Sequence, residues 1–225
     1  TSQTLDQYFR RLLDLDAFAS IDASMNGLQV DNDGKDIKKV AFAVDACKET
    51  FLQAVSSGAD LLFVHHGLFW GKPLPISGVH RERLRILIEN NIALYAVHLP
   101  LDQHPELGNN AALSDLVGIE KLEPFGLYHG KKIGYKGNLA KSLSIEEAAR
   151  KISFMKRPPL AVYPFGKDIN ETCALLSGSA SSELSQAVAE HIDLFITGEV
   201  THSMYHFALE SRINLIAAGH YTTEV

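Results

Sequence analysis

The sequence predicts an α/β protein of two similar, interlocked lobes, in which helices pack on mixed sheets and which arose by internal duplication. Two observations lead to this prediction. Short apolar runs of strand length alternate with helical patterns, as they do in chains of βαβ units. In addition, residues 38–66 and 171–199 can be written one over the other without a gap, and each copy reads as strand, helix and strand.

The two copies of the repeat are followed by the same kinds of element. In the alignment of the two copies, Gln53 corresponds to Gln186 and Asp60 corresponds to Asp193. A helix and a strand are then predicted over 81–90 and 92–97 after the first copy, and over 203–211 and 213–217 after the second. Because short βαβ patterns are common, a chance likeness is the alternative to duplication.

The lobe boundaries follow from the repeat and from the polar residues near the C-terminus. We expect a first lobe over 1–122 and a second over 123–212. Residues 213–225 are expected to return to the first sheet, because His220 and Glu224 would then join the other candidate ligands. Within these lobes, Ser144 followed by Glu147 predicts a helix with a capping box, and Asn109 or Asn110 is expected to cap another helix.

Metal-binding side chains follow four of the predicted strands, at or shortly after the point where each strand ends. The strands are 61–64, 92–97, 194–196 and 213–216, and the side chains after them are those of His65 and His66, His98 and Asp102, Glu199, and His220 and Glu224. Buried apolar strands of this kind belong to covered sheets, which bind ligands beyond the C-terminal ends of their strands. The sequence therefore predicts a metal centre at such an edge.

The spacing of these side chains suits metal binding. His65 and His66 would point to opposite faces of a regular strand, but Gly67 permits an unusual turn, so that both rings can serve metals or one can support the other. His220 and Glu224 are four residues apart, which places them on one face of a helical turn. Imidazoles mixed with carboxylates suit Zn, Mn or Fe, and carboxylates can bridge two ions.

Other residues near this cluster have two or more interpretations. His98 could be a metal ligand, a residue that holds a ligand in place by a hydrogen bond, or a proton carrier. Glu199 could be an acid of the site, a polar contact between subunits, or only a neighbour of a helix N-terminus. Trp70 and Lys72 could stack on a base and pair with a phosphate, or belong to a loop that packs against a neighbouring chain. A lone His or a single His–Glu pair is weak evidence, but several at equivalent strand ends favour metal binding.

Composition restricts the class of protein. The chain has 225 residues, of which 46% are hydrophobic and 21% charged, and its formal charge is −6. This charge disfavours a nucleic-acid partner without excluding a local basic patch. No apolar run approaches the about 20 residues of a membrane span, and residues 1–9 carry no secretory signal. Cys47 and Cys173, which lie far apart, are typical of buried thiols in a reducing compartment, so a cytoplasmic location is expected.

Taken in order, the motifs resemble one known family. They are Asn26-Gly27-Leu28-Gln29-Val30, Val64-His65-His66-Gly67 with Phe69-Trp70, His98-Leu99-Pro100-Leu101-Asp102, His104-Pro105-Glu106-Leu107-Gly108-Asn109-Asn110, Thr197-Gly198-Glu199 and Gly219-His220-Tyr221-Thr222-Thr223-Glu224. This set resembles the dinuclear-metal-centre family of NIF-type (NGG-interacting-factor-like) proteins, whose members are often named GTP cyclohydrolase I type 2 homologues. The resemblance extends from about residue 22 to residue 224.

The resemblance implies a two-lobed α/β protomer that assembles into a toroidal homohexamer with metal pairs facing an inner cavity. Carried over by position, the ligands of two divalent ions per chain are His65, His66, Asp102, His220 and Glu224. The family continues through a further helix, so we expect one to follow Val225 in the complete protein.

A metal-dependent hydrolase of a nucleotide-like substrate, with GTP ring opening as the specific candidate, is therefore the predicted function. Glu199 and His98 are the predicted catalytic residues, and Trp70 and Lys72 the predicted substrate-binding residues. The alternative is a non-enzymatic toroidal assembly that binds metal together with a protein or nucleic-acid partner. Metal storage is a third possibility.

Overall fold

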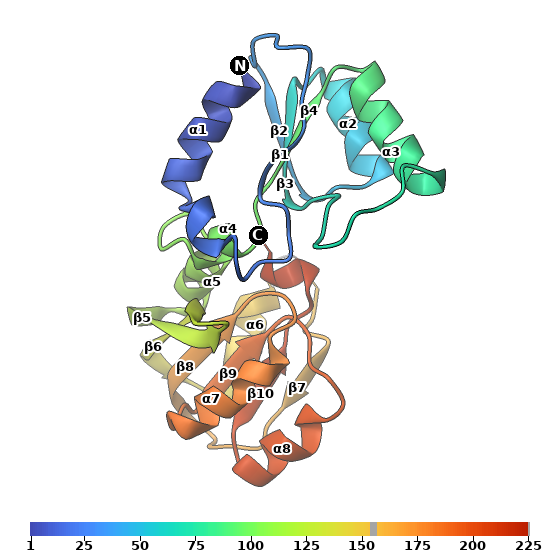
Figure 1. Ribbon diagram of the computed structural model, residues 1–225. Coiled ribbons are helices and arrows are strands. Elements are labelled where there is room, and N and C mark those ends of the chain that lie inside the picture. The colour runs from blue at the N-terminus through green and yellow to red at the C-terminus, as the bar shows by residue number, and fades with distance from the viewer. Residues whose placement is uncertain (154–156, 225) are drawn as a thin grey trace. The chain divides into compact units, whose positions relative to one another are not determined.

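The computed structural model describes residues 1–153 and 157–224, and the chain divides into two compact units. Unit 1 is Thr1–Leu101 and unit 2 is Asp102–Val225 (Figure 1). This division differs from the predicted boundary at residue 122. The difference arises because helix α5 (Asn109–Val117) packs on strands β5 (Ile119–Tyr128) and β6 (Lys131–Leu143), which belong to the second sheet.

Unit 1 contains a four-stranded mixed sheet in the order β1-β4-β3-β2. Its strands are β1 (Gly27–Val30), β2 (Val40–Asp45), β3 (Leu61–His66) and β4 (Ala93–Ala96). The last three are parallel to one another, and β1 is antiparallel to β4. Strand β3 extends through both histidines to His66, two residues further than predicted.

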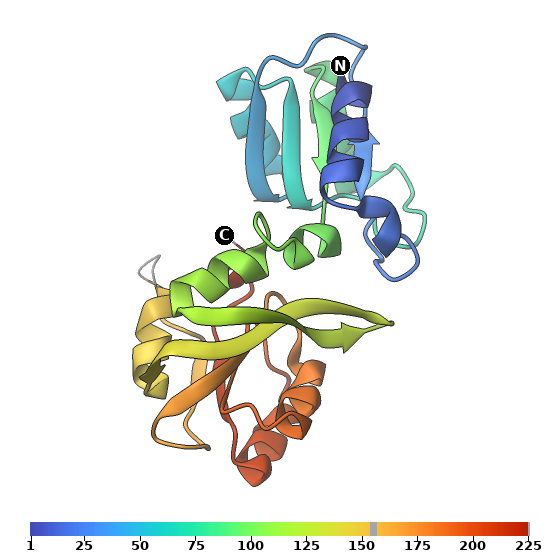
Figure 2. The same cartoon turned by 90° about the vertical axis from the view of Figure 1, so that its left-hand side faces the viewer.

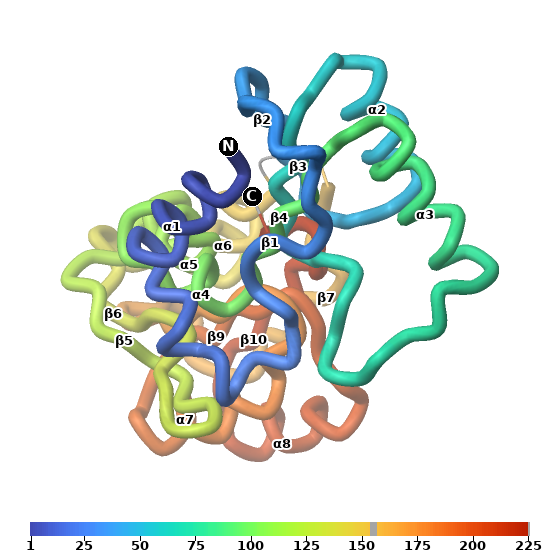
Figure 3. Tube along the Cα trace, turned by 45° about the horizontal axis from the view of Figure 1, so that its top comes forward, coloured from blue at the N-terminus to red at the C-terminus, as the bar shows by residue number. Residues whose placement is uncertain are grey.

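Helices cover the two faces of this sheet unequally. Helices α2 (Lys48–Ser57) and α3 (Gly78–Glu89) lie on one face, and α1 (Ser2–Leu12) lies on the other, followed by the short turn η1 (Leu15–Phe18) (Figures 1 and 2). Residues 67–77 form the long connection between β3 and α3 (Figure 3). Helix α4 (Leu99–Gln103) begins shortly after β4 and carries the chain into unit 2.

Unit 2 contains a six-stranded mixed sheet in the order β5-β6-β8-β9-β10-β7. The further strands are β7 (Ala161–Tyr163), β8 (Asn170–Leu176), β9 (Leu194–Thr197) and β10 (Asn214–Ala217). One apolar core holds residues of α5 and of α6 (Ile145–Ile152), and another holds residues of α7 (Leu184–Ala189) and α8 (Met204–Ser211). The remaining turns are η3 (Ser181–Glu183) and η4 (Tyr221–Thr223).

The prediction that residues 213–225 return to the first sheet is wrong for strand β10. This strand pairs in parallel with β9 and antiparallel with β7, both in unit 2. The buried side chain of Asn214 fixes it there, because its amide donates to Asn170 Oδ1 at 2.8 Å and to the Lys167 carbonyl at 2.7 Å.

The two units repeat one strand arrangement, as the aligned sequence copies suggest. The order β8-β9-β10-β7 in unit 2 matches β2-β3-β4-β1 in unit 1, with the last strand antiparallel in both. Val40 pairs with Leu61, and the aligned Cys173 pairs with Leu194. A duplication that explains this likeness stays a prediction. Among the described residues, no helix is both long and apolar enough to cross a membrane.

Candidate metal centre

Three imidazoles of unit 1 lie together at the carboxyl ends of neighbouring strands. His65 and His66 are the last two residues of β3, and His98 follows β4, which is parallel to β3. One ring nitrogen from each of the three lies within 4.8 Å of the others. The His65 ring centroid is 4.7 Å from that of His66 and 5.0 Å from that of His98. The parallel pairing thus brings together residues that are more than thirty positions apart in the sequence.

Each of these imidazoles is held at Nδ1 by an oxygen acceptor. His65 Nδ1 lies 2.9 Å from the Val97 carbonyl oxygen, His66 Nδ1 lies 2.9 Å from Asp45 Oδ1, and His98 Nδ1 lies 2.9 Å from Asp22 Oδ1. A ring that donates from Nδ1 carries its lone pair on Nε2, the nitrogen with which it binds a metal. The donor set of unit 1 therefore fits a transition metal ion.

Asp22, which the sequence analysis did not single out, organises the segment around His98. Its side chain is only 1% exposed, and it accepts hydrogen bonds from His98 Nδ1, the Leu99 and Ser24 backbone amides and Asn26 Nδ2. Burial alone would raise the pKa of this carboxyl, but the hydrogen bonds from His98 and Asn26 outweigh burial and lower it. Asp22 is therefore an anionic support that fixes the ring and backbone of His98.

The Asn26–Val30 motif fixes the backbone segments that follow β3 and β4, next to the histidines. Asn26 Oδ1 accepts the His98 backbone amide at 2.7 Å. Gln29 Oε1 accepts the Leu68 amide at 2.7 Å, and its Nε2 donates to the Met25 carbonyl at 2.8 Å. These polar contacts fix the chain beside the candidate ligands.

Gly67 is needed for close packing and not, as the sequence suggested, for an unusual turn. Its φ is not in the left-handed region. A Cβ at this position would meet the Gln29 amide and would lie 2.6 Å from Ala96 Cβ. Only glycine therefore lets β3 leave the sheet against β4 and Gln29.

Trp70 completes the aromatic surroundings of the cluster. Its indole donates to the Gly67 carbonyl at 2.9 Å, and its ring lies edge-on to His98 with centroids 5.0 Å apart. The His66 ring centroid is 6.0 Å from that of Trp70. Lys72 lies two residues further on in the exposed part of the connection to α3.

In unit 2, His220 lies between two carboxylates. Its Nε2 is 2.9 Å from Glu224 Oε1, and its Nδ1 is 3.1 Å from Glu199 Oε1. The hydrogen bond to Glu224, with the charges of both carboxylates, raises the pKa of His220 against the effect of burial. Ser179 donates to the other oxygen of Glu199, and this bond is the main cause of the lowered Glu199 pKa. The i,i+4 contact of His220 with Glu224 agrees with the predicted helical turn, which is η4.

Asp102 is buried in unit 2. The expectation that Asn109 or Asn110 caps the helix that follows is wrong. The residue before α5 is Gly108, and Asn109 is already helical. Its Nδ2 donates to Asp102 Oδ1 at 2.9 Å, and Ser177 Oγ donates to the same oxygen at 2.7 Å. Asn109 therefore orients a candidate metal ligand. The predicted capping box at Ser144 and Glu147 is confirmed.

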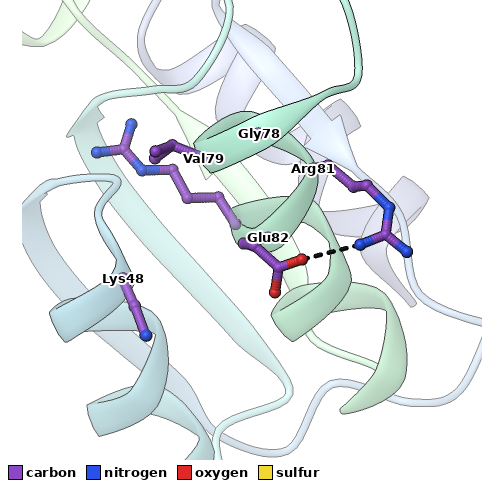
Figure 4. Close-up of a pocket in the computed structure, with 6 residues that line it drawn as sticks. Lys48, Gly78, Val79, Arg81 and Glu82 are labelled. Atoms are coloured by element: carbon purple, nitrogen blue, oxygen red, sulfur yellow. Dashed lines mark hydrogen bonds and ion pairs between the residues drawn. The ribbon is translucent and has the colours of Figure 1, made fainter.

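A separate hollow of about 460 Å³ lies in unit 1 between the first turns of α2 and α3. It is lined by Lys48, Gly78, Val79, Arg81, Glu82 and Arg83 (Figure 4). Glu82 is paired with Arg81 at 2.8 Å and with Arg85 at 3.0 Å. None of the predicted site residues lines this hollow.

The structure thus brings the predicted residues together in two groups. His65, His66, His98 and Trp70 meet within unit 1, and Glu199, His220 and Glu224 meet within unit 2. The supporting residues missed in the sequence are Asp22, Asp45, Ser177 and Ser179. Asp45, Ser177 and Ser179 lie at or just after the end of the first strand of each copy of the repeat, whereas Asp22 lies outside the repeat.

Comparisons with known proteins identify the family and the fold of this chain. The sequence matches the Duf34/NIF3 (NGG1p interacting factor 3) family over residues 1–225. It is 41% identical to the GTP cyclohydrolase 1 type 2 homolog of Treponema pallidum over 100% of this chain and 90% of that protein, and 44% identical to the Archaeoglobus fulgidus protein of the same name over 93% and 85%. TTHA1606 from Thermus thermophilus has a similar structure, with a TM-score of 0.89, 39% identity and coverage of 99% and 87%. The chain belongs to the Duf34/NIF3 family.

Proposed function

We propose that this protein is a dinuclear-metal-dependent hydrolase of a nucleotide-like substrate. The observation that carries the proposal is that His65 and His66, which lie together in unit 1, each have Nδ1 fixed by an acceptor oxygen, since this arrangement prepares Nε2 for a metal. The proposed ligands of two divalent ions are His65, His66, Asp102, His220 and Glu224. Zn, Mn and Fe all suit this mixed donor set.

The ligands in unit 2 support this assignment independently of the unit 1 imidazoles. Asp102 is buried and already oriented by Asn109 and Ser177, as a carboxylate ligand requires. His220 Nε2 and Glu224 Oε1 face each other at 2.9 Å, so that a divalent cation would compete with their shared proton. Held by these residues, two such ions would lower the pKa of a water molecule to near neutrality and would so supply a hydroxide nucleophile.

The chain's own residues would bind the substrate and move protons. His98, held by Asp22 and next to Trp70, is the proposed proton carrier. Glu199, which contacts His220 Nδ1, is the second proposed catalytic residue, and this contact also makes it a support for the His220 ring. Trp70 offers a face on which a base can stack, and Lys72 offers a cation for a phosphate.

The substrate class comes from the relatives. Those at 41% and 44% identity are named GTP cyclohydrolase 1 type 2 homologs, so GTP is the first candidate, with attack at purine C8 and opening of the five-membered ring. A homohexamer in the cytoplasm is proposed on the resemblance described above. The alternative, a metal-binding assembly that recruits a partner, is favoured by the family's own description as an interacting factor.

The test is turnover of GTP and other nucleotides by metal-loaded protein, followed by chromatography and by loss of purine absorbance. The proposal predicts turnover that disappears with chelator and in His65→Ala. In His98→Gln, metal should remain bound while turnover falls by about 10²-fold or more. Metal-loaded wild-type protein without turnover of any nucleotide would contradict the hydrolase proposal and favour the interaction role.

A further inference from the structure

The edge strand β2 leaves an apolar aromatic face uncovered in unit 1. Phe42, at its centre, is 74% exposed, whereas Phe63 beside it is 8% exposed and Tyr95 on the next strand is fully buried. The three rings form a row, with Phe42 and Phe63 centroids 5.5 Å apart and Phe63 and Tyr95 stacked at 5.6 Å. Phe9 of α1 contacts the inner two rings. Helix α1 does not extend over β2 (Figure 2).

The outer edge of β2 also presents regular backbone hydrogen-bonding groups. The Lys39 carbonyl accepts the Asp60 amide at 2.8 Å and therefore points towards β3. Because successive residues of a strand alternate in direction, Val40 and Phe42 point their N–H and C=O groups away from β3. The alternation ends near Asp45, since the Ala46 amide donates to the His66 carbonyl of β3 at 2.8 Å. Natural edge strands are usually protected by proline, bulges or central charges. Residues 40–44 of β2 carry no proline and no charge.

The sequence of β2 and its flanks is self-complementary about Phe42. Residues 39–45 read Lys-Val-Ala-Phe-Ala-Val-Asp, a palindrome in its apolar part with opposite charges at its two ends. In an antiparallel pair centred on Phe42, each Val40 would face Val44 of the partner subunit, and each Lys39 would face Asp45 of the partner subunit. The two copies would then contact each other through the same residues, as a two-fold interface requires.

We propose that β2 pairs antiparallel with β2 of a second copy of this chain, about a two-fold axis at Phe42, to join two unit 1 sheets into one. The N–H and C=O groups of the two Phe42 residues would form about two hydrogen bonds across the axis. Phe42 of each copy would extend the aromatic row across the axis, and the two Lys39–Asp45 pairs would fix the register. Lys39 already donates to the Ser57 carbonyl and keeps further donors for the carboxylate.

This interface reaches the candidate metal centre. Asp45, whose side chain is 57% exposed, holds His66 through Nδ1 at 2.9 Å. An ion pair with Lys39 of the partner subunit would orient the carboxylate that orients this imidazole. The interface stands on the β2 edge alone, and its test is independent of metal binding and turnover.

The first test is particle mass by native mass spectrometry for wild-type protein, Phe42→Asp and Ile88→Asp. Ile88 is a matched control, because it is 65% exposed in the same unit. We expect an even number of chains in the wild-type, a particle of half that number or fewer in Phe42→Asp, and no change in Ile88→Asp. Circular dichroism checks that each variant is folded. A folded Phe42→Asp with wild-type mass, or a wild-type monomer, would overturn the proposal.

A cysteine scan tests the position of the axis. In a Cys47→Ser background, Phe42→Cys places two thiols on residues with Cα atoms about 5.5 Å apart, within reach of a disulfide. Ala41→Cys and Ala43→Cys would each lie about 8 Å from their own copies, beyond that reach. We expect rapid disulfide-linked dimers at position 42 alone, with Ile88→Cys as the control for random collision. Equal cross-linking at 42 and 88, or a maximum at 41 or 43, would overturn the proposed axis.

Discussion

Asp45 and His66 are paired residues at the ends of adjacent parallel strands, and Asp45 Oδ1 accepts His66 Nδ1 at 2.9 Å. The sheet register therefore sets the tautomer of a candidate metal ligand. Asp22 does the same for His98 and the Val97 carbonyl for His65, so that the unit 1 donor set depends on the fold around it. This dependence can be tested at each support.

Removing the support of His66 should weaken metal binding. In Asp45→Ala the ring loses its acceptor and its fixed tautomer, and we expect metal affinity to fall by about 10- to 100-fold. Asp45→Asn, which keeps an acceptor oxygen, should recover part of the loss. Zinc titration against a competing chelator measures both, with the exposed Asp36→Asn as control. Unchanged metal affinity in Asp45→Ala would contradict the assignment of His66, held by Asp45, as a metal ligand.

Asp22→Ala should lower the free energy of unfolding strongly. The substitution leaves several buried donors without their acceptor, including the Leu99 and Ser24 amides, and we expect a loss of about 3 kcal/mol. Urea unfolding measures it, and Asp36→Ala should change stability little. A loss equal to that of the control would contradict the role given to Asp22.

Gly67→Ala should disturb the exit of β3 from the sheet. The added methyl group would meet Ala96 Cβ and the Gln29 amide, which is already bonded to Leu68 and Met25. A loss of about 1–3 kcal/mol in the free energy of unfolding is expected from this overpacking. The matched comparison is Gly67→Ala in a Gln29→Ala background, where the two losses should be less than additive. Strict additivity would show that the methyl group does not press on Gln29.

The ionisation of Asp60 should make the free energy of unfolding depend on pH. The hydrogen bond from Lys35 and the amides of Lys38 and Lys39 lower its pKa to about 2. Because the folded pKa is below the unfolded value, the stabilisation is complete above about pH 4 and is lost as pH falls towards 2. Thermal unfolding of Asp60→Asn should therefore show a lower melting temperature at pH 7 and a smaller dependence on pH between 4 and 2.

The aligned Asp193 offers an independent check on that argument. It accepts the Glu171 and Thr172 amides, the equivalents of Lys38 and Lys39, and pairs with Lys167 at 2.7 Å. Burial opposes these contacts, yet the pKa of Asp193 is lowered as well. Asp193→Asn should destabilise the protein in the same direction as Asp60→Asn. If the melting temperatures of both variants depended on pH as strongly as that of the wild-type protein between pH 4 and 2, this account would be contradicted.

Much of the fold could be predicted because buried apolar runs identify strands by local pattern. β3, β4, β9 and β10 all lie within two residues of their predicted positions. Local pattern does not identify a strand's neighbours, and so the predicted sheet for β10 is wrong. The amide of Asn214 that fixes this strand bonds residues 44 and 47 positions away.

The candidate site could be predicted only in part, for a similar reason. His220 and Glu224 are close in sequence, and a helical turn suffices to bring them together. Asp22 lies 76 positions from His98, in a segment without a periodic pattern. The prediction for Asn109 fails because asparagine at the start of a helix suits both a cap and a side-chain donor, and only the position of Asp102 decides between them.

The most direct test of the central claim is the metal content of each chain. Elemental analysis of protein purified without added metal should find about two ions per chain, as a dinuclear site requires. The His65→Ala/His220→Ala variant should lose them while remaining folded. Wild-type protein that holds no metal, even after incubation with Mn, Zn and Fe, would contradict the proposed centre and leave the clustered imidazoles without a catalytic role.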